Sequence, residues 1–293
     1  MSIQMITTDG TIIPAKFLQF SGGERHVQLD ESVLSDLKGT VNVRASMRSS
    51  NDIMDYLLLE NVLFELGLSV NLEIPYFPYA RQDRACAAGQ AFSLDVMTKL
   101  LNTNGLERNV SLQKTITVWD CHSEKTTELL KRNTCFNEVI NISPAAIIQQ
   151  SARLVEIMTA TNVVLICPDH GAIARTNLIA ESFTDAKPAI ICCEKQRNPL
   201  TGKILNSKVN ATDLTGRTAV ITDDICDGGA TFIGIAQELR KLNCQHIVLY
   251  VTHGIFSRGL EVFDGLIDQI FTTNSFPQQP SNLLNVINFS TNN

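Results

Sequence analysis

The sequence of 293 residues contains no hydrophobic run of membrane-spanning length. A transmembrane helix needs about 20 consecutive apolar residues, whereas the apolar runs here have the length of strands. No basic stretch followed by an apolar segment occurs among the first residues, so we expect no secretory signal peptide. The sequence therefore predicts a cytoplasmic protein without a membrane partner.

The sequence also lacks an excess of basic residues, because 24 Lys and Arg face 30 Asp and Glu. A net charge of −6 is atypical of nucleic-acid-binding surfaces, so we expect no nucleic acid partner. None of the eight cysteines belongs to a CxxC pair, which argues against a zinc site. We interpret them as reduced thiols, as is usual in the cytoplasm.

What the sequence does contain is an alternation of short apolar runs with amphipathic, helix-like segments. This order favours the α/β fold class, with mostly parallel sheets flanked by helices on both faces. The alternation occurs twice, which predicts a first domain over 1–145 and a second over 146–293, with a tail from 278 that returns to the first domain or frays. Strands are predicted at 70–77, 116–120, 162–169, 188–194, 218–224 and 246–254, and helices at 93–105, 172–183, 231–243 and 258–263.

The stretch VITDDICDGGAT, at 220–231, places Asp223 and Asp224 side by side at the end of an apolar strand. Two like charges repel there and are costly to desolvate, so we expect a ligand that compensates them. The glycines at 228 and 229 and the start of the next helix offer backbone N–H groups, which predicts a phosphate-binding loop. The paired carboxylates suit ribose hydroxyls, directly or through Mg²⁺. The alternative is that one aspartate caps the helix and the other faces solvent.

Further charged residues lie at predicted strand ends, where ligands bind in open α/β sheets. Guanidinium groups match phosphate oxygens, and an Asp-x-His pair suits a metal or phosphate contact, although such pairs are common. Two cations entering a polar loop at 198–210 suit charge that develops on a transferred phosphoryl group, the alternative being an ordinary surface loop. These residues are Arg81, Gln82, Asp83 and Arg84 in one loop, Asp120 and His122 in a second, Asp169 and His170 in a third, and Lys195 and Arg197 in a fourth.

Taken together, the motifs resemble the ribose-phosphate pyrophosphokinase (PRPP synthetase) family from about Phe20 to Ser275. They are FSGGE, PYFPYARQDR, WDCH, CPDHG, KQR, VITDDICDGGAT and VTHG. The resemblance implies two phosphoribosyltransferase-like, Rossmann-like domains with the active site between them. It implies Mg²⁺-dependent transfer of the β,γ-diphosphoryl group of ATP to the C1 hydroxyl of ribose 5-phosphate, giving PRPP and AMP. It also implies a homo-oligomer, either a dimer or a hexamer.

The resemblance assigns a role to each matching position. ATP binding falls to Phe20, Glu24, Arg81, Gln82, Asp83, Arg84 and His122, and the Phe20 and Glu24 site is often completed across a subunit boundary. Binding of the ribose phosphate falls to Asp223, Asp224, Asp227, Gly228, Gly229, Ala230 and Thr231. Contact with Mg²⁺ falls to His122, Asp169, Asp223 and Asp224, and catalysis to Lys195, Arg197 and Asp227.

Two departures from the family pattern affect the predicted substrates. Gly22 stands where the family commonly has Asp or Asn, which removes a hydrogen bond to the adenine edge. Gly228 stands where the family's D-T-x-G-T loop has a hydroxyl, so the loop has less side chain. The smaller loop motivates an alternative acceptor, ADP-ribose, which would give ADP-ribose 1-diphosphate.

Two other classes fit the sequence less well. A phosphoribosyltransferase, which consumes PRPP, would leave Arg81, Gln82 and His122 without a role. A non-catalytic regulatory homologue is expected to have lost its loop cations, whereas Lys195 and Arg197 are present.

Overall fold

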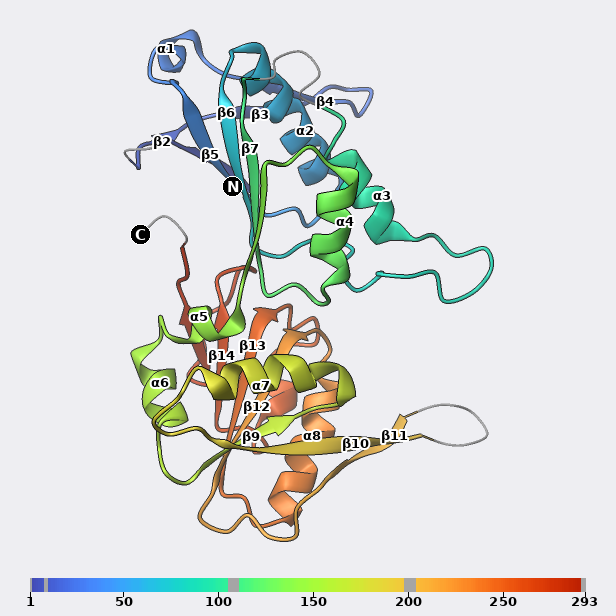
Figure 1. The fold of residues 1–293 in the computed structure, drawn as a ribbon, viewed down its shortest axis with the longest axis vertical. Helices are drawn as coiled ribbons and strands as arrows, with labels where there is room; N and C mark the ends of the chain where they lie inside the picture. Colours follow the sequence, from blue (N-terminus) through green and yellow to red (C-terminus); the bar gives the residue numbers. More distant parts are fainter. Residues whose placement is uncertain (1, 8–9, 105–110, 198–203, 291–293) are drawn as a thin grey trace. The chain divides into compact units, whose positions relative to one another are not determined.

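The computed structural model describes residues 2–7, 10–104, 111–197 and 204–290, without the side chains of 195–197 and 204–207. The chain divides into two compact units, one up to Ile142 and the other from Ser143. Each unit holds one large sheet and its helices (Figure 1).

The first unit contains a six-stranded sheet with the order β2-β1-β5-β6-β7-β8. Its four last strands pair in parallel, and β1 pairs antiparallel with both β2 and β5. A separate hairpin of two strands, β3 and β4, lies outside this sheet. The strands are β1 (Ile3–Ile6), β2 (Ile12–Ile13), β3 (Lys16–Gln19), β4 (Arg25–Gln28), β5 (Thr40–Ala45), β6 (Ser69–Ile74), β7 (Lys114–Trp119) and β8 (Glu138–Ile142), and the helices are α1 (Glu31–Leu34), α2 (Ser50–Glu65), α3 (Ser93–Leu100) and α4 (Lys125–Asn133).

The second unit contains a seven-stranded sheet with the order β11-β10-β9-β12-β13-β14-β15. All neighbours pair in parallel except β10 and β11, which are antiparallel. The strands are β9 (Val163–Cys167), β10 (Ala189–Arg197), β11 (Ile204–Val209), β12 (Thr218–Cys226), β13 (His246–Gly254), β14 (Gln269–Thr273) and β15 (Leu284–Ile287), and the α-helices are α5 (Pro144–Ile148), α6 (Ala152–Met158), α7 (Ile173–Glu181) and α8 (Ala230–Lys241).

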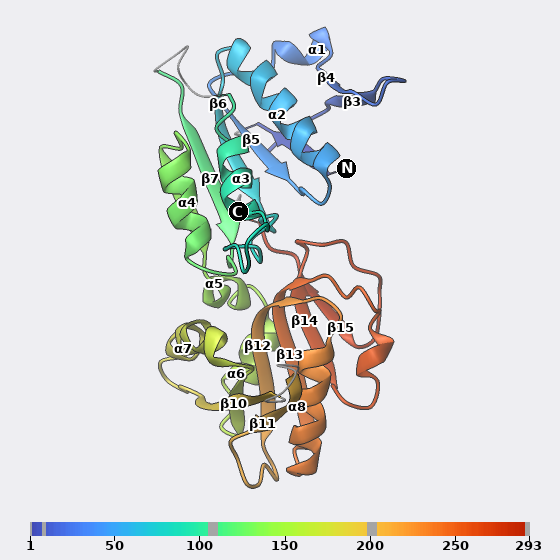
Figure 2. The same ribbon diagram turned by 90° about the vertical axis from the view of Figure 1, so that its right-hand side faces the viewer.

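The central strands of the second sheet are buried on both faces. Every residue of β9 is buried, as are the residues of β13 after His246. Figure 2 shows α7 and α8 on opposite sides of β12, which accounts for this burial. Continuous apolar runs such as VVLIC are typical of parallel strands covered in this way.

The predicted α/β class with mostly parallel sheets is confirmed, whereas three local predictions are wrong. First, β10 continues through Arg197, and 204–209 form β11, so Lys195 and Arg197 lie in a strand rather than past its end. Second, only a 3₁₀ turn, Glu261–Phe263, occupies the helix predicted at 258–263. Third, 284–287 extend the second sheet as β15, so this part of the tail does not return to the first unit.

Within the described residues, no helix combines the length and the apolar character that crossing a membrane requires. All eight cysteines are free thiols.

Candidate active site

The paired aspartates lie in the last residues of β12. Asp224 is buried, Asp223 is half-buried, and the Asp223 carboxylate accepts a hydrogen bond of 2.9 Å from the Asp224 N–H. Burial raises the pKa of Asp223 well above its ordinary value, and repulsion by Asp224 raises it further. The ionised pair is therefore costly, and a ligand that brings a cation or hydrogen-bond donors would lower its energy.

Arg175 partly compensates this charge. Its Nη1 atom lies 3.7 Å from a carboxylate oxygen of Asp223 and 3.7 Å from one of Asp224. The helix that carries it, α7, is fixed to β12 by a buried hydrogen bond of 3.2 Å between the hydroxyls of Thr176 and Thr222. Arg175 was not among the residues predicted from the sequence. The signal was present, because it is the only cation in the helical segment IARTNLIAE.

The predicted phosphate-binding segment, Asp227 to Thr231, comprises the short loop after β12 and the first two residues of α8. Gly229 adopts φ +76°, a left-handed conformation that favours glycine, and precedes the first residue of α8. A Cβ atom at Gly229 would lie only 2.6 Å from the Phe263 ring, so close packing requires glycine as well. The backbone N–H groups at the start of α8 have no partner in their own helix, which makes this end suited to an anion.

Asp169 follows β9, the neighbour of β12 in the sheet. Its Oδ1 atom accepts hydrogen bonds from the backbone N–H groups of Gly171 (2.8 Å) and Ala172 (3.2 Å). Asp169 thus caps the turn that follows β9. Because parallel strands end at the same edge, it lies at the edge that also carries Asp223 and Asp224.

The catalytic candidates Lys195 and Arg197 belong to β10 by backbone. Their side chains lie outside the described residues, as does the predicted loop segment 198–203.

In the first unit, the loop after β6 is hydrogen-bonded to the loop after β7. The Ser123 hydroxyl donates to Asp83 Oδ2 at 3.1 Å, and Arg84 pairs with the same carboxylate at 2.8 Å. Arg84 and Ser123, with nearby His122, hold the pKa of Asp83 below its ordinary value. The two loops that the sequence assigns to ATP are therefore brought together, with Asp83 as the link. Arg81, Gln82 and His122 are exposed around it.

The hairpin β3–β4 carries Phe20 and Glu24 at its turn. The Phe20 side chain is 57% exposed, and its ring lies 5.6 Å from that of His26. The Glu24 carboxylate occupies the space that a Cβ atom at Gly22 would need. An Asp or Asn at that position would therefore displace Glu24, which links the glycine to the glutamate that follows it.

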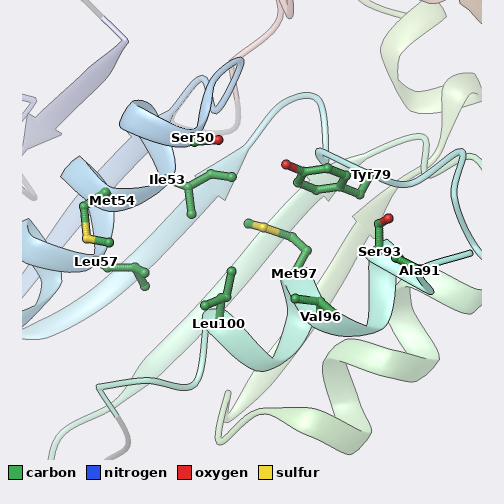
Figure 3. A pocket seen from close by; sticks show the side chains of 10 residues that line it. All are labelled: Ser50, Ile53, Met54, Leu57, Tyr79, Ala91, Ser93, Val96, Met97 and Leu100. Carbon is green, nitrogen blue, oxygen red and sulfur yellow. The ribbon is translucent and has the colours of Figure 1, made fainter. Parts of the chain in front are cut away.

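A pocket of about 360 Å³ lies between α2 and α3 in the first unit (Figure 3). Its lining is mostly apolar and includes Met54, Val96 and Met97, and none of its side chains is charged. Tyr79, at the edge of the pocket, precedes Arg81 by two residues. The absence of charge in this lining makes it unsuited to phosphate groups.

No group of three or more His, Cys, Asp or Glu side chains is placed to hold a metal ion in the described part of the chain. Mg²⁺ is commonly held by one or two carboxylates while substrate phosphates and water complete its shell. Asp223 and Asp224 provide two carboxylates whose ionisation needs a compensating cation. They therefore fit Mg²⁺ that arrives with a phosphate-bearing substrate.

Comparisons with known proteins define the class first. Residues 137–281 match the family described as phosphoribosyl transferase domain, and residues 6–105 match the N-terminal domain of ribose phosphate pyrophosphokinase. The fold resembles the crystal structure of phosphoribosylpyrophosphate synthetase from Mycobacterium smegmatis, with a TM-score of 0.75 and 22% identity over 95% of this chain and 87% of that one. The protein is thus an α/β protein of the phosphoribosyltransferase-like class.

Sequence relatives then identify the family. The ribose-phosphate pyrophosphokinase of Mycoplasmopsis pulmonis is 30% identical over 84% of this chain and 74% of that protein. The one from Parasynechococcus marenigrum is 28% identical over 89% of this chain and 74% of that protein. The chain belongs to the ribose-phosphate pyrophosphokinase family of enzymes, which confirms the resemblance seen in its motifs.

Proposed function

We propose that this enzyme transfers the β,γ-diphosphoryl group of ATP to the C1 hydroxyl of a ribose 5-phosphoryl acceptor, with ribose 5-phosphate as the acceptor in the simplest case. The O1–Pβ bond forms, the bond from Pβ to the oxygen bridging Pα breaks, and AMP leaves. The hydroxyl loses its proton, and the products are PRPP and AMP. The observation that carries this proposal is the costly pair of carboxylates next to a glycine-rich loop at a helix N-terminus.

On the acceptor side, Asp223, Asp224 and Asp227 bind the ribose hydroxyls. Hydrogen bonds from sugar hydroxyls to the two carboxylates reduce the repulsion between them. This repulsion therefore favours binding of the sugar. The N–H groups from Gly228 to Thr231 bind the 5-phosphate. Together these contacts hold the C1 hydroxyl in place, and most of the catalytic effect in phosphoryl transfer comes from such positioning.

On the donor side, Arg81, Gln82 and His122 bind the ATP phosphates, while Phe20 and Glu24 bind the adenine. Asp83 orients this group, because it joins the loops that carry Arg81 and His122. Lys195 and Arg197 stabilise the charge that develops on the transferred group. We further propose that the enzyme acts in the cytoplasm as a homo-oligomer, in which a partner subunit completes the adenine site.

When bound, Mg²⁺ neutralises charge on the phosphate oxygens and so assists their transfer. Asp223 and Asp224 would hold it, with Asp169, at the same edge of the second sheet, as a further contact. The residues of the chain keep the nucleotide and the sugar aligned.

A second acceptor, ADP-ribose, is favoured by one observation. The first three residues after Asp227 are Gly228, Gly229 and Ala230, which leave the loop without side-chain donors before Thr231. A loop that binds through its backbone leaves room for a group attached beyond the 5-phosphate.

The test is to substitute Lys195 by Ala and measure steady-state kinetics of AMP release. We expect turnover to fall by more than about a hundredfold, or about 2.7 kcal/mol in the barrier, with little change in ATP affinity. Turnover within about tenfold of the wild type would contradict a catalytic role for Lys195.

A further inference from the structure

The phosphate loop is joined to a second loop that has no assigned role. This second loop, Ile255–Gly259, follows β13, which pairs with β12. The backbone N–H groups of Ile255 and Phe256 donate to the Cys226 carbonyl at 2.8 and 3.1 Å. The Ser257 hydroxyl donates to Asp227 Oδ1 at 2.6 Å. The two loops therefore form one unit at the end of the sheet.

A pair of aromatic rings holds these two loops in place. The rings of Phe256 and Phe263 meet edge to face with 6.4 Å between their centroids. The Phe263 ring also packs against Gly229, where a Cβ atom would be 2.6 Å away. The backbone that carries Arg258 is thus held at a defined place beside the phosphate loop.

The stem of Arg258 occupies the place of a side chain at Gly228. A Cβ atom at Gly228 would lie 3.2 Å from Arg258 Cδ and 3.7 Å from its Cγ. Gly228 does not adopt a left-handed φ, unlike Gly229, so its backbone does not require glycine. The absence of a side chain at position 228 therefore makes room for the stem of Arg258. A larger residue at 228 would occupy part of the same space.

The guanidinium group of Arg258 is available to a ligand. The residue is exposed, and within the described ranges no side chain or carbonyl forms a hydrogen bond or ion pair with it. Guanidinium groups bind phosphate oxygens in pairs, which makes them selective for phosphate groups in a fixed place. In the proposed function the backbone N–H groups and Thr231 bind the first phosphate. The Arg258 stem lies beside Gly228 in this loop, so its guanidinium is placed to bind the next phosphate.

We propose that Arg258 binds the phosphate chain at position 5 of the acceptor and selects acceptors in which this chain is a diphosphate. The substrate class is then a ribose 5-diphosphate whose far phosphate carries a further group, as in ADP-ribose. This inference rests on the proposed diphosphoryl transfer and decides between its two acceptors.

The test compares Arg258→Met with Arg258→Lys and with Arg217→Met as a matched control. Arg217 is also exposed but precedes β12, at the opposite end of the strand from Asp227. For each protein, kcat/KM for AMP release is measured with ADP-ribose and with ribose 5-phosphate at saturating Mg²⁺ and ATP. Calorimetry of ADP-ribose binding without ATP gives a second readout.

We expect Arg258→Met to lower the ratio of kcat/KM values, ADP-ribose over ribose 5-phosphate, about 10- to 100-fold, because one charged contact to phosphate is lost. The affinity for ADP-ribose should fall by a similar factor, Arg258→Lys should retain most of the ratio, and Arg217→Met should not change it. Gly228→Thr displaces the arginine stem and should lower the ratio in the same direction.

An unchanged ratio in Arg258→Met, or equal losses with both acceptors, would overturn the selection of a diphosphate while leaving the proposed transfer intact. A wild-type enzyme that prefers ribose 5-phosphate would also overturn it. A wild-type enzyme that binds neither acceptor and releases no AMP would instead refute the proposed function itself.

Discussion

Replacing Arg175 by Met tests the electrostatic account of the aspartate pair. The guanidinium lies 3.7 Å from each carboxylate, and its side chain is only 11% exposed. At an effective dielectric constant of about 20, one such pair contributes about 4 kcal/mol of Coulomb energy. Removing one member of a buried pair typically costs 3–5 kcal/mol. Because Asp223 retains some exposure, we expect a loss of about 3 kcal/mol in the free energy of unfolding at pH 8.

The stability lost in Arg175→Met should be larger at high pH than at low pH. The pKa of Asp223 is higher in the folded protein than in the unfolded chain, so its contribution to stability is present at low pH and is lost as the pH rises through the folded pKa. Arg175→Met raises this pKa further, so the loss of stability extends to higher pH and becomes larger. We therefore expect the stability difference between wild type and variant to be smaller at pH 5.5 than at pH 8.

Calorimetry of thermal unfolding measures this difference. For a unit of about 150 residues, each kcal/mol shifts Tm by about 2–4 °C, so the variant should melt roughly 6–12 °C lower at pH 8. Trp119, the only tryptophan, belongs to the first unit, so its fluorescence transition should shift less. Arg175→Lys keeps the charge and should lose less stability, and adding Asp223→Asn to Arg175→Met should restore part of it. A Tm shift that is equal at both pH values would refute the reasoning.

Three further predictions concern other parts of the two units. Lys114→Met should destabilise the first unit by about 3–5 kcal/mol in urea unfolding, because it leaves the fully buried Glu60, 2.7 Å from Lys114 Nζ, without its cation. The double variant Lys114→Met with Glu60→Leu should recover stability. A single variant as stable as the wild type would contradict this prediction. Gly229→Ala should cost more than about 1 kcal/mol and weaken acceptor binding, because φ is +76° and Phe263 fills the space; an unaltered Tm would show that the loop relaxes freely. Asp223→Asn should raise Tm through lost repulsion while abolishing Mg²⁺-dependent turnover, and unchanged acceptor affinity in calorimetry would remove Asp223 from the sugar site.

The sequence predicted those elements whose apolar residues correspond to the buried positions in the structure. The strand at 246–254 was predicted at its observed bounds, because its continuous apolar run IVLYV is typical of a strand covered on both faces. The helix α2 was not predicted, although it has 16 residues. Its apolar residues lie on several sides of the helix, so the sequence shows no distinct apolar face. Its buried side chains include Asp55 and Glu60, whose partners Arg25 and Lys114 are distant in sequence.

The candidate site could be inferred from the sequence where its residues follow one another in the chain. Asp223, Asp224 and the loop after them form one continuous motif, and the loop after β6 forms another. Arg175 and Arg258 were not found, because each meets the motif only through the pairing of strands and the packing of a helix. Contacts of this kind depend on the tertiary structure and leave no local pattern.

The most direct test of the central claim is the identity of the products. Purified enzyme is incubated with Mg²⁺, ATP and either ribose 5-phosphate or ADP-ribose, and nucleotides and sugar phosphates are identified by mass spectrometry. Transfer of a diphosphoryl group predicts AMP and a 1-diphosphate of the acceptor in equal amounts, with AMP release absent when no acceptor is added. Formation of ADP, or no reaction with either acceptor, would contradict it.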